Sequence, residues 1–331
     1  MRFGPPVALA IALLLPLSIS AQSLGDFGSS ASSFSVSISP QYPMPYGQAT
    51  LSFLSSTIDL TNASMSVMVA GKNIYKGNIQ PMTVTLGKAG AVTQVEVSIT
   101  SGGTQYSQSI AIQPQDVALV AEPISSAPPL YPGKPSVPLE GNVRVVAIAN
   151  MRNASGKALD PHTLSYTWIV DKAQITNASG IGKEAIMVAS PLQYRSREVS
   201  VSVMSQDGSL VGGSTLSLSA LDPSVRIYEN DPLLGVRFDH ALFGSYSIKS
   251  AEATLFAAPF SFGTSRGSPT LEWFLNGVHA QTGGIITLRP SGNGQGSASL
   301  SLVASSGDYM RASTNLSLSF GTTKGFNLFG L

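Results

Sequence analysis

The feature that most constrains the fold is a strand-like segment that occurs twice around a tryptophan. LSYTWIVDK contains Trp168 and PTLEWFLNG contains Trp273, and these are the only two tryptophans in the chain. A fainter copy, ASMSVMVAG, has Val67 at its centre. The three central positions are separated by 101 and 105 residues, and a small β-sandwich has about 100 residues. A period of that length predicts three tandem domains, with these three side chains in their structural cores.

Alternation of apolar residues with Ser or Thr predicts β-strands throughout the chain. Period-two alternation over short segments, with Gly, Pro, Asn or Ser between them, is typical of half-exposed antiparallel sheets. No segment after residue 21 has the 3.6-residue period of a helix of ten or more residues. We therefore predict an all-β fold of three tandem antiparallel β-sandwiches. The alternating segments are residues 35–38, 49–54, 82–86, 95–99, 109–112, 117–121, 143–149, 198–203, 214–218, 225–228, 297–303 and 312–320.

The repeats also share a Pro followed by a Gly before their second strand, at Pro45–Gly47, Pro132–Gly133 and Pro232–Gly235. This supports a true internal repeat. The predicted division is a signal peptide over 1–21, a flexible leader over 22–34, sandwich 1 over 35–113, sandwich 2 over 114–221, sandwich 3 over 222–320 and an apolar tail over 321–331.

The second repeat contains a stretch that is rich in proline. Six prolines lie between residues 123 and 138, and proline at this density cannot pair inside a sheet. We expect residues 123–138 to form an extended, polyproline-like loop or a sheet edge.

The first residues have the pattern of a signal peptide. Arg2 provides a positive charge, residues 7–17 are an apolar run, and Ser18–Ala21 offers small residues for cleavage. The apolar run is shorter than the roughly 20 residues of a membrane span. We expect cleavage near Ala21 or Gln22, no transmembrane span after cleavage, and an extracellular or cell-envelope location.

Composition excludes several classes of function. Charged residues make up 11% of the chain and the formal net charge is +1, so we expect no binding to nucleic acid. The chain has no cysteine, which excludes disulfides, thiolate metal sites and a cysteine nucleophile. An exported chain without cysteine fits a bacterial envelope better than an animal secretory pathway.

Catalytic motifs are absent or out of context. Gly263–Gly267 matches the G-x-S-x-G string of serine hydrolases, but that motif needs a helix after it, and here the Trp273 strand follows. Gly180–Lys183 lacks the spacing of a phosphate-binding loop, and Gly292–Gly296 runs into a strand instead of a helix N-terminus. We predict loops at all three places, no enzyme activity and no cofactor.

Metal sites are not expected either. His162, His240 and His279 fall in turns or strand ends without a companion histidine or acid at ligand spacing. We expect them to be isolated surface residues. Asp231 and Asp239 come closest to a calcium site, but such a site needs several carboxylates together.

The two tryptophan strands carry a family resemblance. Tyr166–Val170 (YTWIV) and Leu271–Gly277 (LEWFLNG) resemble the central strand of PKD-type and related immunoglobulin-like domains of bacterial surface proteins. The chain, with its turn at Tyr228–Leu233, is similar to exported three-repeat proteins of small-genome, candidate-phylum bacteria that have no assigned activity. It lacks the Gly-Asp-Gly turn of PKD domains. The resemblance implies three immunoglobulin-like or PKD-like sandwiches in an extracellular, non-catalytic array, in some cases associated with pilus or surface machinery.

The tail is surplus to the third sandwich and is strongly apolar. Fully burying a large apolar side chain gains about 1.5–3 kcal/mol, so exposure of these residues is costly. One interpretation is that the tail folds back on the third sandwich. The other is that it docks on another envelope or surface protein, as a strand added to an open sheet edge. The candidate docking residues are Phe326, Leu328, Phe329 and Leu331.

Two functions fit these observations. The favoured one is a structural or adhesive surface module that binds a partner through its loops and edges. The alternative is an accessory carbohydrate- or protein-binding module of a secreted degradative system. A carbohydrate binder should expose coplanar aromatic rings, which would require Trp168 and Trp273 to be accessible to solvent; we expect both instead in the cores.

Overall fold

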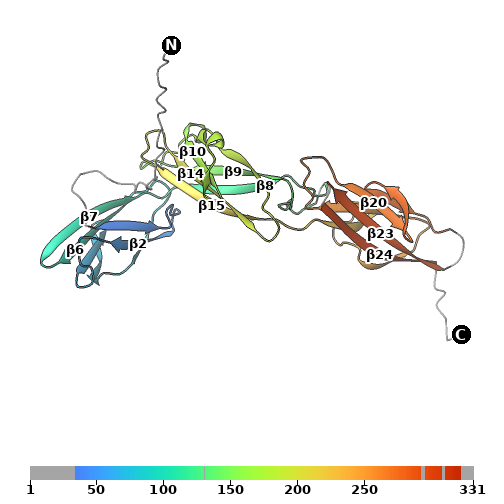
Figure 1. Ribbon diagram of the computed structural model, residues 1–331, viewed down its shortest axis with the longest axis horizontal. Helices are drawn as coiled ribbons and strands as arrows, with labels where there is room; N and C mark the ends of the chain where they lie inside the picture. The colour runs from blue at the N-terminus through green and yellow to red at the C-terminus, as the bar shows by residue number, and fades with distance from the viewer. Residues whose placement is uncertain (1–33, 130, 292–294, 308–309, 322–331) are drawn as a thin grey trace, which may run out of the picture. The chain divides into compact units, whose positions relative to one another are not determined.

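A computed structural model of the protein describes residues 34–129, 131–291, 295–307 and 310–321. Within these ranges nearly all regular structure is β-strand, arranged as six sheets that form three consecutive sandwiches (Figure 1). The fold is therefore all-β, with three tandem immunoglobulin-like sandwiches, and the predicted fold class is confirmed. The expected signal peptide over 1–21 lies outside the described residues.

The first sandwich pairs a three-stranded sheet with a four-stranded sheet. Buried side chains of both sheets, among them Leu51, Met65, Val67 and Val97, form its core. The sheets have the strand orders β1-β2-β5 and β4-β3-β6-β7, with β1 Ser35–Ser39, β2 Gln48–Leu54, β3 Ser64–Val69, β4 Lys72–Asn78, β5 Met82–Thr85, β6 Thr93–Ser101 and β7 Thr104–Ile112.

The second sandwich repeats this plan. Val145 and Ile186 of one sheet meet Trp168 and Val201 of the other in a single core. One sheet has the order β13-β9-β8, and in the other the path β11-β10-β14-β15 also pairs β12 with β10. The strands are β8 Asp116–Pro123, β9 Asn142–Asn150, β10 Ser165–Val170, β11 Ala173–Gln174, β12 Gly180–Ile181, β13 Ala185–Ala189, β14 Ser196–Met204 and β15 Val211–Ser219. Two single-turn 3-10 helices, η1 (Pro161–Thr163) and η2 (Thr176–Ala178), lie in its loops.

The third sandwich contains the longest strands. Leu255 and Ile227 of one sheet pack with Trp273 and Leu302 of the other. The strand orders are β17-β16-β19-β22 and β18-β24-β23-β20-β21. The strands are β16 Ser224–Asp231, β17 Gly235–Val236, β18 Gly244–Ile248, β19 Ala253–Phe260, β20 Thr270–Leu275, β21 Val278–Thr282, β22 Ile285–Leu288, β23 Gly296–Ser306 and β24 Met310–Phe320.

One pairing departs from the predicted antiparallel arrangement. Strand β18 runs parallel to β24, from Gly244 beside Leu316 to Ile248 beside Phe320. A parallel partner needs a long connection, and here β18 and β24 are separated by most of the third repeat. Local alternation in the sequence does not reveal such a pairing.

The outward faces explain the abundance of Ser and Thr. Hydroxyl side chains face each other across paired strands, as in Ser98–Ser107 at 2.8 Å and Ser200–Thr215 at 3.1 Å. Cross-strand pairs of this kind stabilise an exposed sheet face without adding charge, which fits the low charge content of the chain.

The described residues divide into two compact units. The first contains the residues up to Ser39 together with Ala49–Val84 and Thr93–Ile112. The second contains Pro40–Gln48, Thr85–Val92 and the chain from Gln113 onward, so the second and third sandwiches belong to one unit.

Candidate functional site

The two tryptophans and Val67 occupy equivalent central strands, β10, β20 and β3. All three side chains are fully buried. Each indole N–H donates a hydrogen bond of 2.8 Å to a backbone carbonyl, that of Trp168 to Lys183 and that of Trp273 to Gly283. The buried rings with satisfied donors offer no surface to a ligand.

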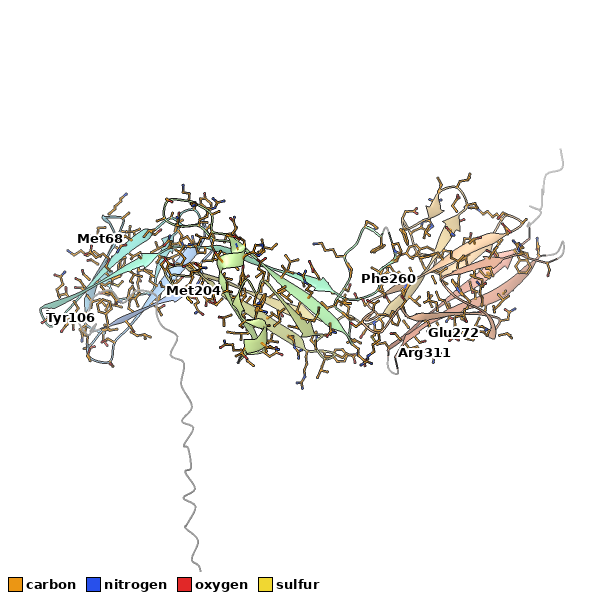
Figure 2. All side chains as sticks on the ribbon, turned by 90° about the horizontal axis from the view of Figure 1, so that it is seen from above. Met68, Tyr106, Met204, Phe260, Glu272 and Arg311 are labelled. Atoms are coloured by element: carbon orange, nitrogen blue, oxygen red, sulfur yellow. The ribbon has the colours of Figure 1, made fainter. Side chains whose placement is uncertain are left out.

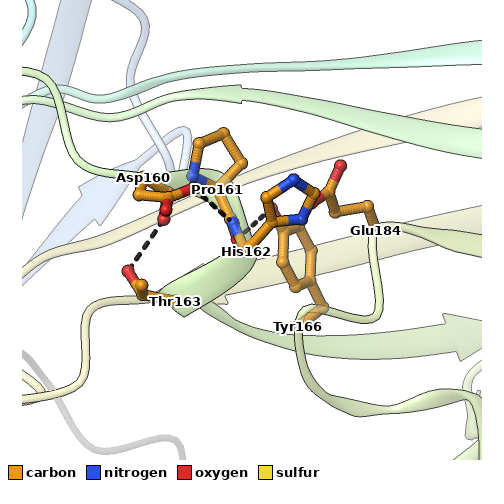
Figure 3. Close-up of polar contacts among 6 residues, drawn as sticks. All are labelled: Asp160, Pro161, His162, Thr163, Tyr166 and Glu184. Carbon is orange, nitrogen blue, oxygen red and sulfur yellow. Dashed lines mark hydrogen bonds and ion pairs between the residues drawn. The ribbon is translucent and has the colours of Figure 1, made fainter.

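Two of the three histidines, His162 and His240, each lie beside a carboxylate. The expectation of isolated residues is therefore wrong for these two. Nδ1 of His162 lies 2.8 Å from Oε1 of Glu184 (Figure 3). Nδ1 of His240 lies 3.0 Å from Oδ2 of Asp239. Glu184 follows His162 by 22 residues, and the fold closes that distance. In the described part of the chain no group of three or more His, Cys, Asp or Glu side chains is placed to hold a metal ion.

Asp160 and Tyr166 explain why His162 is held at this loop. Asp160 accepts a hydrogen bond from the His162 backbone N–H at 3.1 Å, and the buried Tyr166 hydroxyl donates to the Pro161 carbonyl at 3.1 Å (Figure 3). Burial, with the negative charges of Glu184 and Asp160, raises the pKa of Tyr166 to about 12. Tyr166 therefore stays protonated at neutral pH, and the cluster braces a loop.

The G-x-S-x-G string lies in the loop between β19 and β20, as the sequence predicts. Ser265 and Arg266 line a cavity of about 180 Å³ together with Glu140 and Met310. No histidine is among the described residues that line it. The string lies between two strands, β19 and β20, and so lacks the helix that the serine-hydrolase motif requires after it.

The proline-rich segment, which we define as residues 124–139, joins the second sandwich to the third. Strand β8 extends through Pro123, and the segment that follows pairs locally with residues 261–264. Ser126 is central to this contact: its N–H donates to the Phe262 carbonyl at 2.7 Å, and its Oγ accepts from the Phe262 N–H at 3.1 Å. Leu139 packs against the core of the third sandwich.

Tyr131 of the proline-rich segment covers aromatic side chains on the outside of the third sandwich. Its ring makes edge contacts with Phe260, at 5.1 Å between centroids, and with Phe238, at 6.0 Å (Phe260 is labelled in Figure 2). Phe238 in turn contacts Tyr228 and Phe256. An extended segment of one repeat thus shields an apolar sheet face of the next.

The outer face of the β13-β9-β8 sheet has a different character from the Ser- and Thr-rich faces. Its central rows are apolar, and Val120, Ile148 and Met187 are 39%, 55% and 52% exposed. We call this set the apolar face: Ala118, Val120, Val146, Ile148, Ala185 and Met187. The sequence analysis did not identify this face. The run VVAIA in β9 has apolar residues at successive positions, and these point alternately to the two faces of the sheet, which is a signal that both faces are apolar.

Two loop tips also expose large apolar side chains. Leu233 and Leu234, between β16 and β17, are 93% and 77% exposed, and Phe243 before β18 is exposed too. Oδ1 of Asp231 accepts hydrogen bonds from the N–H groups of Leu233 and Leu234, at 2.8 and 2.9 Å. These bonds lower the pKa of Asp231, and they fix the tip that presents the two leucines.

The tail residues predicted to dock on a partner lie outside the described residues: Phe326, Leu328, Phe329 and Leu331. Within the part of the chain that the structure describes, no helix is long and apolar enough to span a membrane.

Comparison with known proteins finds likeness at the level of fold only. No protein-family model matches the chain, and no curated protein matches it. Among solved structures, it is similar to the three N-terminal domains of the bacteriophage RB49 Highly Immunogenic Outer Capsid protein, with 13% identity, 88% of this chain and 100% of that chain covered, and a TM-score of 0.24. It is similar to the central fibronectin-III array of RIM-binding protein, with 9% identity, 87% and 96% covered, and a TM-score of 0.31. It is also similar to the fibronectin(III)-like modules of Clostridium thermocellum CbhA, with 10% identity, 62% of this chain and 99% of that chain covered, and a TM-score of 0.24. Matches this weak carry no argument about function.

Proposed function

We propose that the protein is a non-catalytic exported surface protein, a structural or adhesive module of the cell envelope that binds another envelope or surface protein. The observation that carries this proposal is the apolar face, an exposed apolar sheet surface on a chain in which other outward sheet faces are rich in Ser and Thr or, as in the third sandwich, are shielded by aromatic side chains. Exposed apolar patches on soluble domains mark interaction sites. Pilus or surface machinery is one setting that the resemblance to bacterial surface proteins favours.

Export and bacterial origin are part of the same proposal. The motivation is the pattern of residues 1–21 together with the absence of cysteine. The resemblance of the repeats to exported proteins of candidate-phylum bacteria points the same way. The non-catalytic assignment is motivated by the three histidines, each of which has at most one acidic partner among the described residues, and by the loop position of Ser265.

The alternative is an accessory carbohydrate- or protein-binding module of a secreted degradative system. Tyr194 favours it, because this side chain is 94% exposed at a turn of the second sandwich. Sugar-binding platforms use several coplanar rings, and the buried tryptophans are not available for one. The adhesive function therefore has the stronger support.

Cell fractionation of the full chain tests the proposal. We expect the protein in the envelope fraction, and we expect a variant lacking residues 322–331 in the medium, with unchanged thermal stability. Thr322→Ser together with Thr323→Ser is the matched control, because it alters the tail but keeps its apolar residues. Recovery of the full chain from the cytoplasm would contradict the proposal. Loss of thermal stability on truncation would mean that the tail belongs to the third sandwich.

A further inference from the structure

The apolar face is defined by cross-strand neighbours that point away from the core of the second sandwich. Ala118 lies beside Ile148, Val120 beside Val146, and Val146 beside Ala185. In the next row Arg144 lies between Glu122 and Met187, and its Nη1 contacts Oε2 of Glu122 at 2.6 Å. The face is therefore an apolar strip with one neutralising ion pair at its edge.

In the third sandwich, the outer face of the corresponding β17-β16-β19-β22 sheet is covered by other side chains. Tyr228 on β16 and Ala258 on β19 point away from that core and yet are fully buried. The covering groups are Tyr131 from the proline-rich segment and Phe238 from the loop after β17. In the third sandwich the outer face of this sheet thus accommodates an extended segment that carries an aromatic side chain.

We propose that the apolar face of the second sandwich binds residues 321–331 of a second copy of this chain. The inference rests on the proposed function, in which this segment docks on a partner, and it identifies that partner. Phe326 follows Gly325, and Tyr131 of the segment that covers the third sandwich lies two residues before Gly133, so both segments have an aromatic side chain close to a glycine. Phe329 and Leu331 add further apolar area.

The size of the face favours a segment over a sheet-to-sheet dimer. Three strands spaced by about 4.8 Å and five residues long, at about 3.4 Å each, present roughly 250 Å². A stable protein–protein interface buries about 800 Å² on each partner. An extended run of six residues is about 20 Å long, which matches the length of the face.

Reach keeps Phe326 of the same copy away from the apolar face. Met310, at the start of β24, lines a small cavity together with Gly141 and Asn142 at the junction of the second and third sandwiches. Phe320 lies at the other end of β24, about 34 Å away along the strand. Six residues span at most about 22 Å, so Phe326 falls short of the junction, and the apolar face lies on the far side of it.

A contact between the tail of one copy and the second sandwich of the next is heterologous. Each copy then has one donor segment and one acceptor face, so association continues from copy to copy unless the geometry closes a ring. The contact is small, and assembly should therefore depend on protein concentration.

Sedimentation velocity of the full chain over a range of concentrations tests this inference. The full chain should associate, whereas Ile148→Glu, which puts a charge in the acceptor face, should weaken association at least about tenfold, because burying an unpaired carboxylate is costly. A donor variant, Phe326→Ser with Phe329→Ser, should be weakened equally. Ser217→Glu adds the same charge to the exposed Ser/Thr face of the same sandwich and should associate like the unaltered chain.

Mixing the two defective variants gives the sharpest readout. Ile148→Glu keeps a donor tail, and the tail variant keeps an acceptor face, so an equimolar mixture should form one-to-one dimers and nothing larger. A full chain that stays monomeric at every concentration overturns the inference. Loss of association in the tail variant but not in Ile148→Glu overturns it too, because the tail then binds elsewhere; the reverse pattern indicates face-to-face pairing instead and also overturns it.

Failure of the inference and failure of the proposed function are distinguishable. A monomeric chain whose envelope retention still requires residues 322–331 binds a different protein, so the function stands and the inference falls. A chain that associates through the apolar face but is found in the cytoplasm leaves the inference intact and removes the surface function.

Discussion

The indole rings of Trp168 and Trp273 serve the same purpose one repeat apart. Each is enclosed in a sandwich core, and each ties its strand to a neighbouring loop through a hydrogen bond to Lys183 or Gly283. We predict that Trp168→Ala and Trp273→Ala each lower the free energy of unfolding by about 3–5 kcal/mol, as truncation of buried aromatics does. Calorimetry of each variant checks this. A loss in the free energy of unfolding below about 1 kcal/mol would place the rings at the surface and favour a role for them in binding a ligand.

Tyr166 gives a prediction for alkaline pH. The pKa of its hydroxyl is raised from 10.0 to about 12 by burial, with contributions from Glu184 and Asp160. Between those two values the unfolded chain releases the proton and the folded chain keeps it, so this residue's stabilising contribution is complete below the unfolded pKa and is lost as pH rises through the folded pKa. Tyr166→Phe should therefore flatten the decline of stability over that interval. The near-ultraviolet absorbance difference between the two proteins should show a component with a pKa of about 12; a component at the ordinary value would contradict the burial argument.

At the scale of elements, the proline-rich segment is the connection that distinguishes the second and third sandwiches from independent domains. Gly263 has no room for a side chain, because a Cβ there would overlap the Glu140 carbonyl oxygen. We predict that Gly263→Ala costs about 1–3 kcal/mol by overpacking this contact. Gly284→Ala is the matched control, since a Cβ at Gly284 would meet no atom within 4 Å.

Urea unfolding of these variants in a Trp168→Phe background isolates the third sandwich, because Trp273 is then the only fluorescent indole. Gly263→Ala should shift the midpoint and Gly284→Ala should not. Equal midpoints for both would mean that the close contact between Gly263 and Glu140 contributes nothing to the stability of the third sandwich.

The fold class could be predicted from the sequence because antiparallel strands with one solvated face leave a period-two pattern. Among the strands that were missed are β21, which is exposed along its whole length and so has no such pattern, and β18, which pairs with a strand at the far end of its repeat. The pairing of His162 with Glu184 could not be predicted, because it depends on how two loops meet. The apolar face was missed for a related reason, since a run such as VVAIA indicates a strand but not which of its two faces is covered.

At the scale of the whole molecule, the described residues form three separate cores and leave exposed loops and the apolar face on the surface. Four residues in the last stretch of the sequence supply the apolar groups that such a face would accept: Phe326, Leu328, Phe329 and Leu331. Under the proposed function, the protein acts by presenting these surfaces to a partner, so its action depends on where the surfaces are displayed.

Labelling of a single introduced cysteine on intact cells tests the surface function most directly. The chain contains no cysteine, so Ser217→Cys, at an exposed position of β15, gives one reactive thiol without background. Val199→Cys, buried in the core of the second sandwich, is the control for accessibility. We expect a membrane-impermeant maleimide to label Ser217→Cys on intact cells and to label Val199→Cys only after denaturation. Labelling of Ser217→Cys only after the cells are lysed would contradict this expectation.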